Sequence, residues 1–127
     1  MPLLHGVDLV DISRIESMLE THGDAFLQRV FTATERRDAE AGGKRRCEHY
    51  AARFAAKEAV FKAMGTGWAG GISWTDVGIE RKPGGQPMVC ITGEAAQVAA
   101  DMGVTSWAIS LSHTEQHAMA SVVGTTT

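Results

Sequence analysis

The helical segment that spans residues 53–67 places a carboxylate where an amphipathic helix would normally present a core side chain. At about 3.6 residues per turn, Phe54, Glu58 and Phe61 fall on one face of such a helix. A buried, unpaired carboxylate is costly, so Glu58 needs a cation, either a neighbouring lysine or a metal ion. The segment also carries three bases and ends in a turn with free backbone amides: Arg53, Lys57, Lys62, Gly65, Thr66 and Gly67. This combination indicates a site for a metal ion and a phosphate.

A second carboxylate, Asp8, lies inside the apolar segment of residues 6–10. An isolated aspartate in a strand more often faces solvent or caps the following helix. Here Asp11 already stands at the cap position, and apolar residues flank Asp8 on both sides. Because carboxylate oxygens suit Mg²⁺, Asp8 is a candidate ligand beside Glu58.

Two further features have an ordinary interpretation and a functional one. Glu58 and Lys62 could form a surface pair at i and i+4, worth only about 0.3–0.5 kcal/mol, although an exposed pair needs no aromatic neighbours. His113 follows a predicted strand, where a histidine is usually a turn or surface residue. As a donor beside Ser112 and Thr114, it could instead hold a phosphate.

The composition is typical of one globular domain. The chain has 127 residues, of which 44% are hydrophobic and 21% charged, and its net charge is −3. No general basic field draws it to nucleic acid, so an anionic partner must meet local clusters such as Lys44-Arg45-Arg46. Cys47 and Cys90 lack metal-type spacing, and we expect free thiols rather than a disulfide. Residues 1–5 show no signal peptide pattern and no segment approaches a membrane span, so we expect a cytoplasmic protein.

Helical patterns come first along the chain and alternating strands come later. We expect a strand at residues 3–10, then helices at 12–22, 24–30, 32–41 (opened by a Thr32–Glu35 capping box) and 44–64. Strands follow at 73–80 and 87–92 as a hairpin, then a helix at 94–102 and paired strands at 106–112 and 117–123. This order indicates the α+β class, as a single domain over residues 1–127 with one long helix and a small antiparallel sheet.

Taken together, these residues resemble the holo-acyl-carrier-protein synthase family, the short form of the 4′-phosphopantetheinyl transferases. Residues 6–10, with Arg14 downstream, resemble its G-[IV]-D-[IL] motif, and residues 31–36 match its F-T-x-x-E segment. Residues 53–67 match R-[FW]-[AS]-x-K-E-A-x-x-K-A-x-G-T-G at every defined position. Residues 85–87 resemble its G-x-P turn, and residues 110–114 its S-x-S-H-[ST] segment. The resemblance therefore covers nearly the whole chain.

The resemblance implies a reaction and an assembly. Phosphopantetheine would pass from coenzyme A to a serine of an acyl-carrier protein, with release of adenosine 3′,5′-bisphosphate. Asp8 and Glu58 would bind Mg²⁺, which Mn²⁺ could replace, and Lys62 would stabilise or protonate the leaving phosphate. Glu58, or a water on the metal, would help to deprotonate the serine hydroxyl. The family also implies a homotrimer with sites between neighbouring subunits.

The resemblance also assigns residues to the two substrates. Those expected on coenzyme A and its phosphates are Arg45, Arg53, Lys57, Lys62, Gly65, Thr66, Gly67 and His113. Those expected on the acidic carrier protein are Arg14, Met18, Phe26 and Arg29, although Glu16, Glu20 and Asp24 lie close to them in sequence. The longer, surfactin-type transferases have a second carboxylate two residues after the aspartate. Val10 stands there in this chain, so water should fill more of the metal shell.

Two other classes of function fit the same residues. The chain could be a different Mg²⁺-dependent enzyme, such as a nucleotide hydrolase that uses the same carboxylates. It could also be a non-catalytic module that binds coenzyme A or a carrier protein. The presence of both Glu58 and Lys62 argues against the second alternative, because a binding module needs no cation for a leaving group.

Overall fold

The computed structural model of the protein describes residues 3–65 and 71–126, and its fold is α+β, as the sequence predicts. Its N-terminal elements are β1 (Leu3–Asp11), α1 (Ile12–His22), α2 (Asp24–Val30), α3 (Ala33–Glu40), the 3₁₀ turn η1 (Gly43–Arg45) and α4 (Arg46–Met64). The remaining elements are the 3₁₀ turn η3 (Trp74–Asp76), β2 (Val77–Arg81), β3 (Pro87–Ile91), α5 (Gly93–Asp101), β4 (Ser106–His113) and β5 (His117–Thr125). Thr66 and Gly67 of the predicted glycine turn lie outside the described residues.

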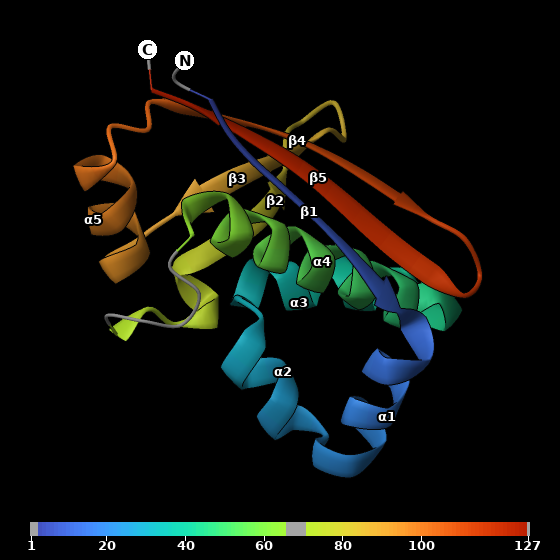
Figure 1. The fold of residues 1–127 in the computed structure, drawn as a ribbon. Helices are drawn as coiled ribbons and strands as arrows, with labels where there is room; N and C mark the ends of the chain where they lie inside the picture. Colours follow the sequence, from blue (N-terminus) through green and yellow to red (C-terminus); the bar gives the residue numbers. More distant parts are fainter. Residues whose placement is uncertain (1–2, 66–70, 127) are drawn as a thin grey trace.

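The long helix α4 runs beneath a three-stranded antiparallel sheet whose strand order is β1-β5-β4 (Figure 1). It packs mainly against β1 and β5, so the first and last strands of the chain cover the same helix. The pair α1–α2 lies on the other side of α4 from the sheet (Figure 1). Thirteen of the nineteen α4 residues are buried, which explains why the helix carries alanine on several of its faces.

Strand β1 approaches α4 closely because residue 6 is glycine. A Cβ at Gly6 would lie 1.9 Å from the backbone oxygen of Ala59 and 3.0 Å from the backbone nitrogen of Ala63. Side chains alternate along β1, so Gly6, Asp8 and Val10 all point toward the helix while Val7 and Leu9 point outward. The close approach therefore brings the Asp8 side chain to the surface of α4.

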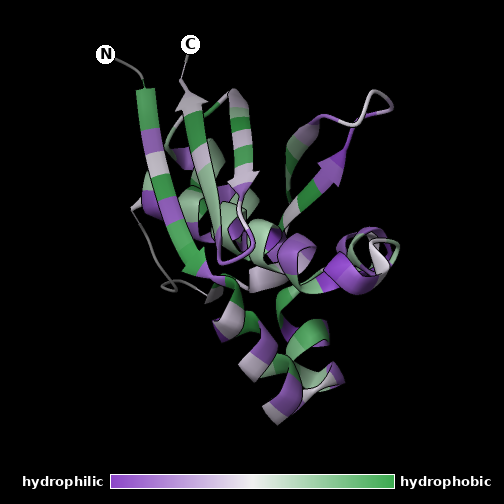
Figure 2. Cartoon of the chain, turned by 90° about the vertical axis from the view of Figure 1, so that its right-hand side faces the viewer, coloured by the Kyte–Doolittle hydropathy of each residue, from purple (hydrophilic) through white to green (hydrophobic). Residues whose placement is uncertain are grey.

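The hairpin predicted for residues 73–92 forms, but it is a separate two-stranded sheet, β2–β3, beside the three-stranded one (Figure 2). Its first segment corrects the sequence prediction: residues 74–76 form η3, and the strand begins only at Val77. The Asp76 carboxylate accepts hydrogen bonds from the backbone nitrogens of Ser73 (3.2 Å) and Ala95 (3.4 Å). These bonds fold the chain into a turn where an extended strand was expected.

Several predicted boundaries are confirmed at the level of single hydrogen bonds. The capping box is present, with Thr32 accepting from the Glu35 nitrogen and Glu35 accepting from the Thr32 nitrogen. Asp11 occupies the N-cap of α1, but its side chain makes no capping bond and lies 3.1 Å from His117 Nε2. Cys47 and Cys90 are free thiols, as expected. None of the described helices is long and apolar enough to cross a membrane.

Candidate active site

Asp8 from β1 and Glu58 and Lys62 from α4 form one cluster at the edge of the sheet. Lys62 Nζ lies 2.9 Å from Asp8 Oδ1 and also donates a hydrogen bond to the Val7 carbonyl oxygen at 3.1 Å. Glu58 and Lys62 are one helical turn apart, so both side chains face β1. The structure therefore brings together the three residues whose types suggest metal and phosphate chemistry.

The electrostatics of this cluster come from two close carboxylates. Partial burial, and then the negative charge of Asp8, raise the pKa of Glu58, while Lys62 and Arg14 oppose that rise. The hydrogen bond to Asp8 raises the pKa of Lys62, which keeps its ammonium group charged. Lys62 is largely exposed and Asp8 largely covered, so the lysine can reach a substrate while Asp8 stays fixed against the helix.

This donor set fits a divalent cation. Two neighbouring carboxylates repel each other, and a cation between them would remove the repulsion that raises the pKa of Glu58. Among the described residues, no group of three or more histidine, cysteine or acidic side chains converges on a common point. The set therefore suits Mg²⁺, which keeps several waters and takes few protein ligands, better than a metal that needs a full protein shell.

Lys57 corrects the sequence prediction. Its side chain is fully buried, and Nζ lies 2.7 Å from Glu35 Oε1, a carboxylate that is also fully buried. Nζ also donates hydrogen bonds to the carbonyl oxygens of Trp74 and Val77. Burial lowers the pKa of Lys57 and the carboxylate of Glu35 opposes this change. This position contradicts the expectation that Lys57 contacts coenzyme A, because its donors point into the core.

Arg53 and His113 line a second feature, a pocket of about 310 Å³ between α4, the β2–β3 hairpin and β4. Arg53 is only 2% exposed; one of its nitrogens donates to the His49 carbonyl oxygen (3.1 Å), and its Nε has no hydrogen-bond partner. Burial, then the nearby charge of Arg81, lower the pKa of Arg53. The wall of this pocket therefore contains a desolvated guanidinium group, whose Nε is buried and unpaired.

Two lining residues of this pocket escaped the sequence analysis. Arg81, which ends β2, and His49 of α4 both line it. Neither stands in a recognisable motif. His49 lies one helical turn before Arg53 on α4, whereas the folding of the hairpin against this helix brings Arg81 into the same pocket. Arg45, which was expected near coenzyme A, is an exposed residue of η1 and is not part of the pocket lining in this chain.

The carboxylate cluster and the Arg53 pocket occupy different sides of α4. Arg53 and Glu58 are five positions apart, which is about 140° around a helix axis. One chain therefore does not bring every residue expected on coenzyme A into a single cavity. Gly65, which ends α4 in a left-handed conformation (φ 72°), lies next to the undescribed part of the glycine turn.

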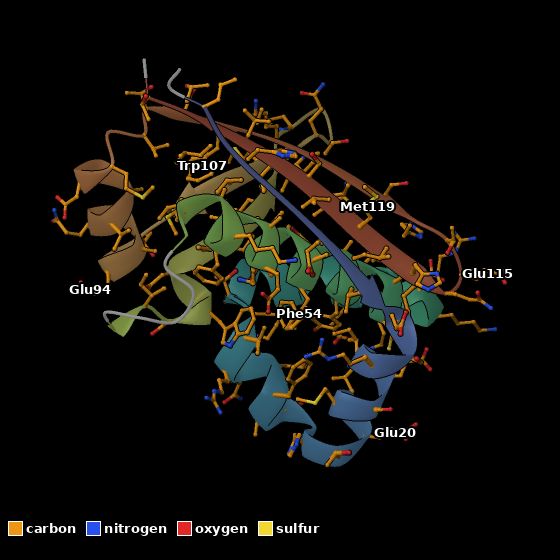
Figure 3. All side chains as sticks on the ribbon, viewed as in Figure 1. Glu20, Phe54, Glu94, Trp107, Glu115 and Met119 are labelled. Carbon is orange, nitrogen blue, oxygen red and sulfur yellow. The ribbon has the colours of Figure 1, made fainter. Side chains whose placement is uncertain are left out.

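The four residues expected to meet the carrier protein do converge. All four line one pocket of about 300 Å³ between α1, α2 and α4: Arg14, Met18, Phe26 and Arg29. Phe54 and Trp74 form part of the same wall, with their rings stacked 5.0 Å apart, and Arg14 lies 5.6 Å above the Phe54 ring. Figure 3 shows Phe54 facing from α4 toward the α1–α2 pair. The pocket lining thus combines apolar side chains with two arginines.

Comparison with known proteins gives a consistent match along the chain. The sequence model of the 4′-phosphopantetheinyl transferase superfamily matches residues 5–121. A holo-[acyl-carrier-protein] synthase of Koribacter versatilis (strain Ellin345) is 46% identical over 118 residues, which are 93% of this chain and 94% of that protein. The crystal structure of holo-[acyl-carrier-protein] synthase from Neisseria meningitidis has a TM-score of 0.86 at 32% identity and covers 95% of this chain and 96% of that one.

A coenzyme A complex of the Chronobacterium ammoniagenes ACPS has a TM-score of 0.83 at 30% identity, over 98% of each chain. The family model spans most of β1 and all of α4 and β4, and the structural match covers 98% of this chain. The chain therefore belongs to the holo-[acyl-carrier-protein] synthase family of the 4′-phosphopantetheinyl transferase superfamily.

Proposed function

We propose that this enzyme transfers the 4′-phosphopantetheine group of coenzyme A to a serine of an apo-acyl-carrier protein. The observation that carries the proposal is the cluster of Asp8, Glu58 and Lys62, which joins two carboxylates to an exposed, charged lysine. The solved relative that contains coenzyme A supports the choice of donor substrate. The other product would be adenosine 3′,5′-bisphosphate.

The residues have distinct roles in the proposed reaction. Asp8 and Glu58 would hold Mg²⁺, which neutralises charge on the diphosphate of coenzyme A. The serine oxygen forms a bond to the phosphorus next to pantetheine, and the bond from that phosphorus to the bridging oxygen breaks. Glu58, or a water on the metal, is the candidate base for the serine proton. Lys62 stabilises the negative charge on the leaving phosphate or donates a proton to it.

The carrier protein would dock on the pocket formed by α1, α2 and α4. The Arg14 and Arg29 charges at this pocket complement an acidic partner, and the apolar wall from Met18 and Phe54 suits a hydrophobic side chain of that partner. Cys47 and Cys90 are free, which fits the reducing cytoplasm in which we propose the enzyme works.

The outer face of the three-stranded sheet supports assembly into a homotrimer. Its exposed large apolar residues are Leu3, Val7 and Leu9 on β1 and Met119 on β5. Leu9 pairs with Met119 across the sheet, and β4 continues the same face with the small side chains of Ala108, Ser110 and Ser112. An exposed apolar patch of this kind marks a surface that another protein covers. A neighbouring subunit could then bring its Arg53 pocket toward the carboxylates of this chain.

The main test is a mass measurement. Apo-carrier protein is incubated with the enzyme, coenzyme A and Mg²⁺, and we expect a mass increase equal to one phosphopantetheine. The variant Glu58→Ala should abolish this increase while its circular dichroism spectrum stays native. Consumption of coenzyme A without modified carrier would instead indicate a hydrolase, and binding without any chemistry would indicate a non-catalytic module.

The shared site has its own test. Arg53→Ala and Glu58→Gln chains are each expected to be inactive, but co-expressed chains form mixed trimers. If each site takes Glu58 from one subunit and Arg53 from the next, about a quarter of the sites would be intact, since each position is filled correctly half of the time. No recovery of activity in verified mixed assemblies would exclude a site shared in this way.

A further inference from the structure

The most deeply buried charges in the described residues form a pair, Lys57 and Glu35, which has no contact with the proposed metal site. Both side chains are 0% exposed and lie 2.7 Å apart. Glu35 comes from the first turn of α3, and Lys57 comes from the middle of α4. Burying two charges is expensive, and a buried ion pair often adds little stability compared with apolar residues of similar volume. A contribution to the stability of the core is therefore a weak explanation for this pair.

The remaining bonds of the pair all go to main-chain atoms of neighbouring segments. Glu35 Oε2 accepts a hydrogen bond from the Ile79 nitrogen at 2.8 Å, and Oε1 accepts one from the Thr32 nitrogen at 2.8 Å. Lys57 Nζ donates to the carbonyl oxygens of Trp74 (3.2 Å) and Val77. Three contacts thus fall within residues 74–79, which run from η3 into β2.

Residues 74–79 form walls of both substrate pockets. The Trp74 ring stacks on Phe54 and lines the pocket that contains Arg14 and Met18. Ile79 lines the pocket that contains Arg53 and His113. Lys57 donates a hydrogen bond to Trp74 at one end of this segment, and its partner Glu35 accepts one from Ile79 at the other end. Lys57 also directly precedes Glu58 in the chain. A single buried pair therefore connects two pocket walls to the helix that carries Glu58.

We propose that Lys57 and Glu35 are positioning residues that hold residues 74–79 against α4 and so fix both substrate pockets relative to Glu58. This proposal rests on the proposed transferase function, because it assigns the two pockets to the nucleotide and the carrier protein. Neither residue touches a substrate or a reacting atom. A charged pair suits this position because it satisfies the main-chain nitrogens of Thr32 and Ile79 and the main-chain oxygens of Trp74 and Val77 together.

The test compares stability with substrate affinity in Lys57→Met and Glu35→Gln. Each variant is assayed well below its own unfolding midpoint, measured by near-ultraviolet circular dichroism. We expect the KM for carrier protein to rise about tenfold or more, since a displacement of about 1 Å can cost a hundredfold in rate. We expect the dissociation constant for adenosine 3′,5′-bisphosphate, measured by calorimetry, to rise in parallel.

The matched control is Tyr50→Phe. Tyr50 is also fully buried on α4, and its hydroxyl donates to Glu40 at 2.6 Å, away from residues 74–79. This variant should lose stability while both constants stay at the wild-type values. If Lys57→Met and Glu35→Gln behave like the control, with lower midpoints but unchanged constants, the positioning role is refuted.

A milder variant covers the case in which those changes prevent folding. Glu35→Asp keeps the charge but shortens the side chain, so we expect a folded protein in which the Ile79 amide exchanges with solvent faster and both constants rise. Wild-type exchange at Ile79 together with wild-type constants would overturn the proposal. The two proposals can fail separately. A wild-type enzyme that binds adenosine 3′,5′-bisphosphate but transfers nothing would refute the proposed transferase function. The dissociation constants of the variants for this nucleotide would still test the positioning role of Lys57 and Glu35.

Discussion

The close contact between β1 and α4 predicts a large effect of the small substitution Gly6→Ala. The added Cβ would lie 1.9 Å from the backbone oxygen of Ala59, whereas an ordinary contact begins near 3.4 Å. Strand and helix must therefore separate by about 1.5 Å, since a backbone oxygen cannot rotate away as a flexible side chain can. Asp8 lies on the same strand two residues later, so it would move away from Glu58 and Lys62.

The size of the effect follows from the geometry. Overpacking of this kind costs about 1–3 kcal/mol of the free energy of unfolding. For a chain of this length, that lowers the unfolding midpoint by about 4–11 °C. The rate of transfer should fall about a hundredfold, which is about 2.7 kcal/mol, because a catalytic group displaced by about 1 Å no longer reaches its partner. A protein with a free energy of unfolding of about 5–15 kcal/mol stays mostly folded after a loss of this size, so transfer should fall while the fold persists.

Thermal unfolding and mass-spectrometric transfer assays, run at a temperature where both proteins are folded, measure these two effects. Gly84→Ala is the matched control, because a Cβ at Gly84 would meet nothing within 4 Å. It should leave the rate unchanged and alter stability by less than about 1 kcal/mol. A Gly6→Ala protein with wild-type midpoint and wild-type rate would show that the contact with Ala59 does not position Asp8.

Three further changes test other parts of the structure. Burial, then the hydrogen bond to Glu40, raise the pKa of Tyr50 above its ordinary value of about 10. The folded state keeps this proton longer than the unfolded state, so its contribution to stability is complete below pH 10 and is lost as pH rises further. Because Tyr50 is the single tyrosine of the chain, tyrosinate absorbance should appear only with unfolding. Asp8→Asn should abolish transfer in a folded protein and lower the pKa of Glu58, which carboxylate NMR would detect. Arg14→Glu should raise the KM for carrier protein at least about tenfold and leave the KM for coenzyme A unchanged, as steady-state kinetics would show.

The sequence predicted the elements best where local chemistry marks their ends. The Thr32–Glu35 capping box and Gly65 at the end of the long helix are short-range signals, and the structure has both. The pairing of β1 with β5 joins opposite ends of the chain, and no local pattern specifies it. Local patterns also missed the turn η3, because this turn depends on a hydrogen bond that the Asp76 carboxylate accepts from the Ala95 nitrogen in a later helix.

The site residues divide in the same way. Asp8, Glu58 and Lys62 were recognisable because a carboxylate in an apolar stretch needs a partner, and the structure brings the three together. Lys57 was misassigned because helical periodicity orders the faces of α4 without saying which face meets Glu35. A charged residue on a helix that is buried nearly all round is as easily a core residue as a ligand, and only the tertiary contacts decide.

The register of β1 with β5 also has a consequence for engineering the chain. Leu3 lies opposite Thr125, so both ends of the described sheet are side by side, far from α1 and α2 (Figure 1). A short flexible linker could join them without crossing either pocket, and new ends could be opened at the exposed turn between β2 and β3. A circular permutant built in this way should keep the pairing of β1 with β5 while making it local in sequence.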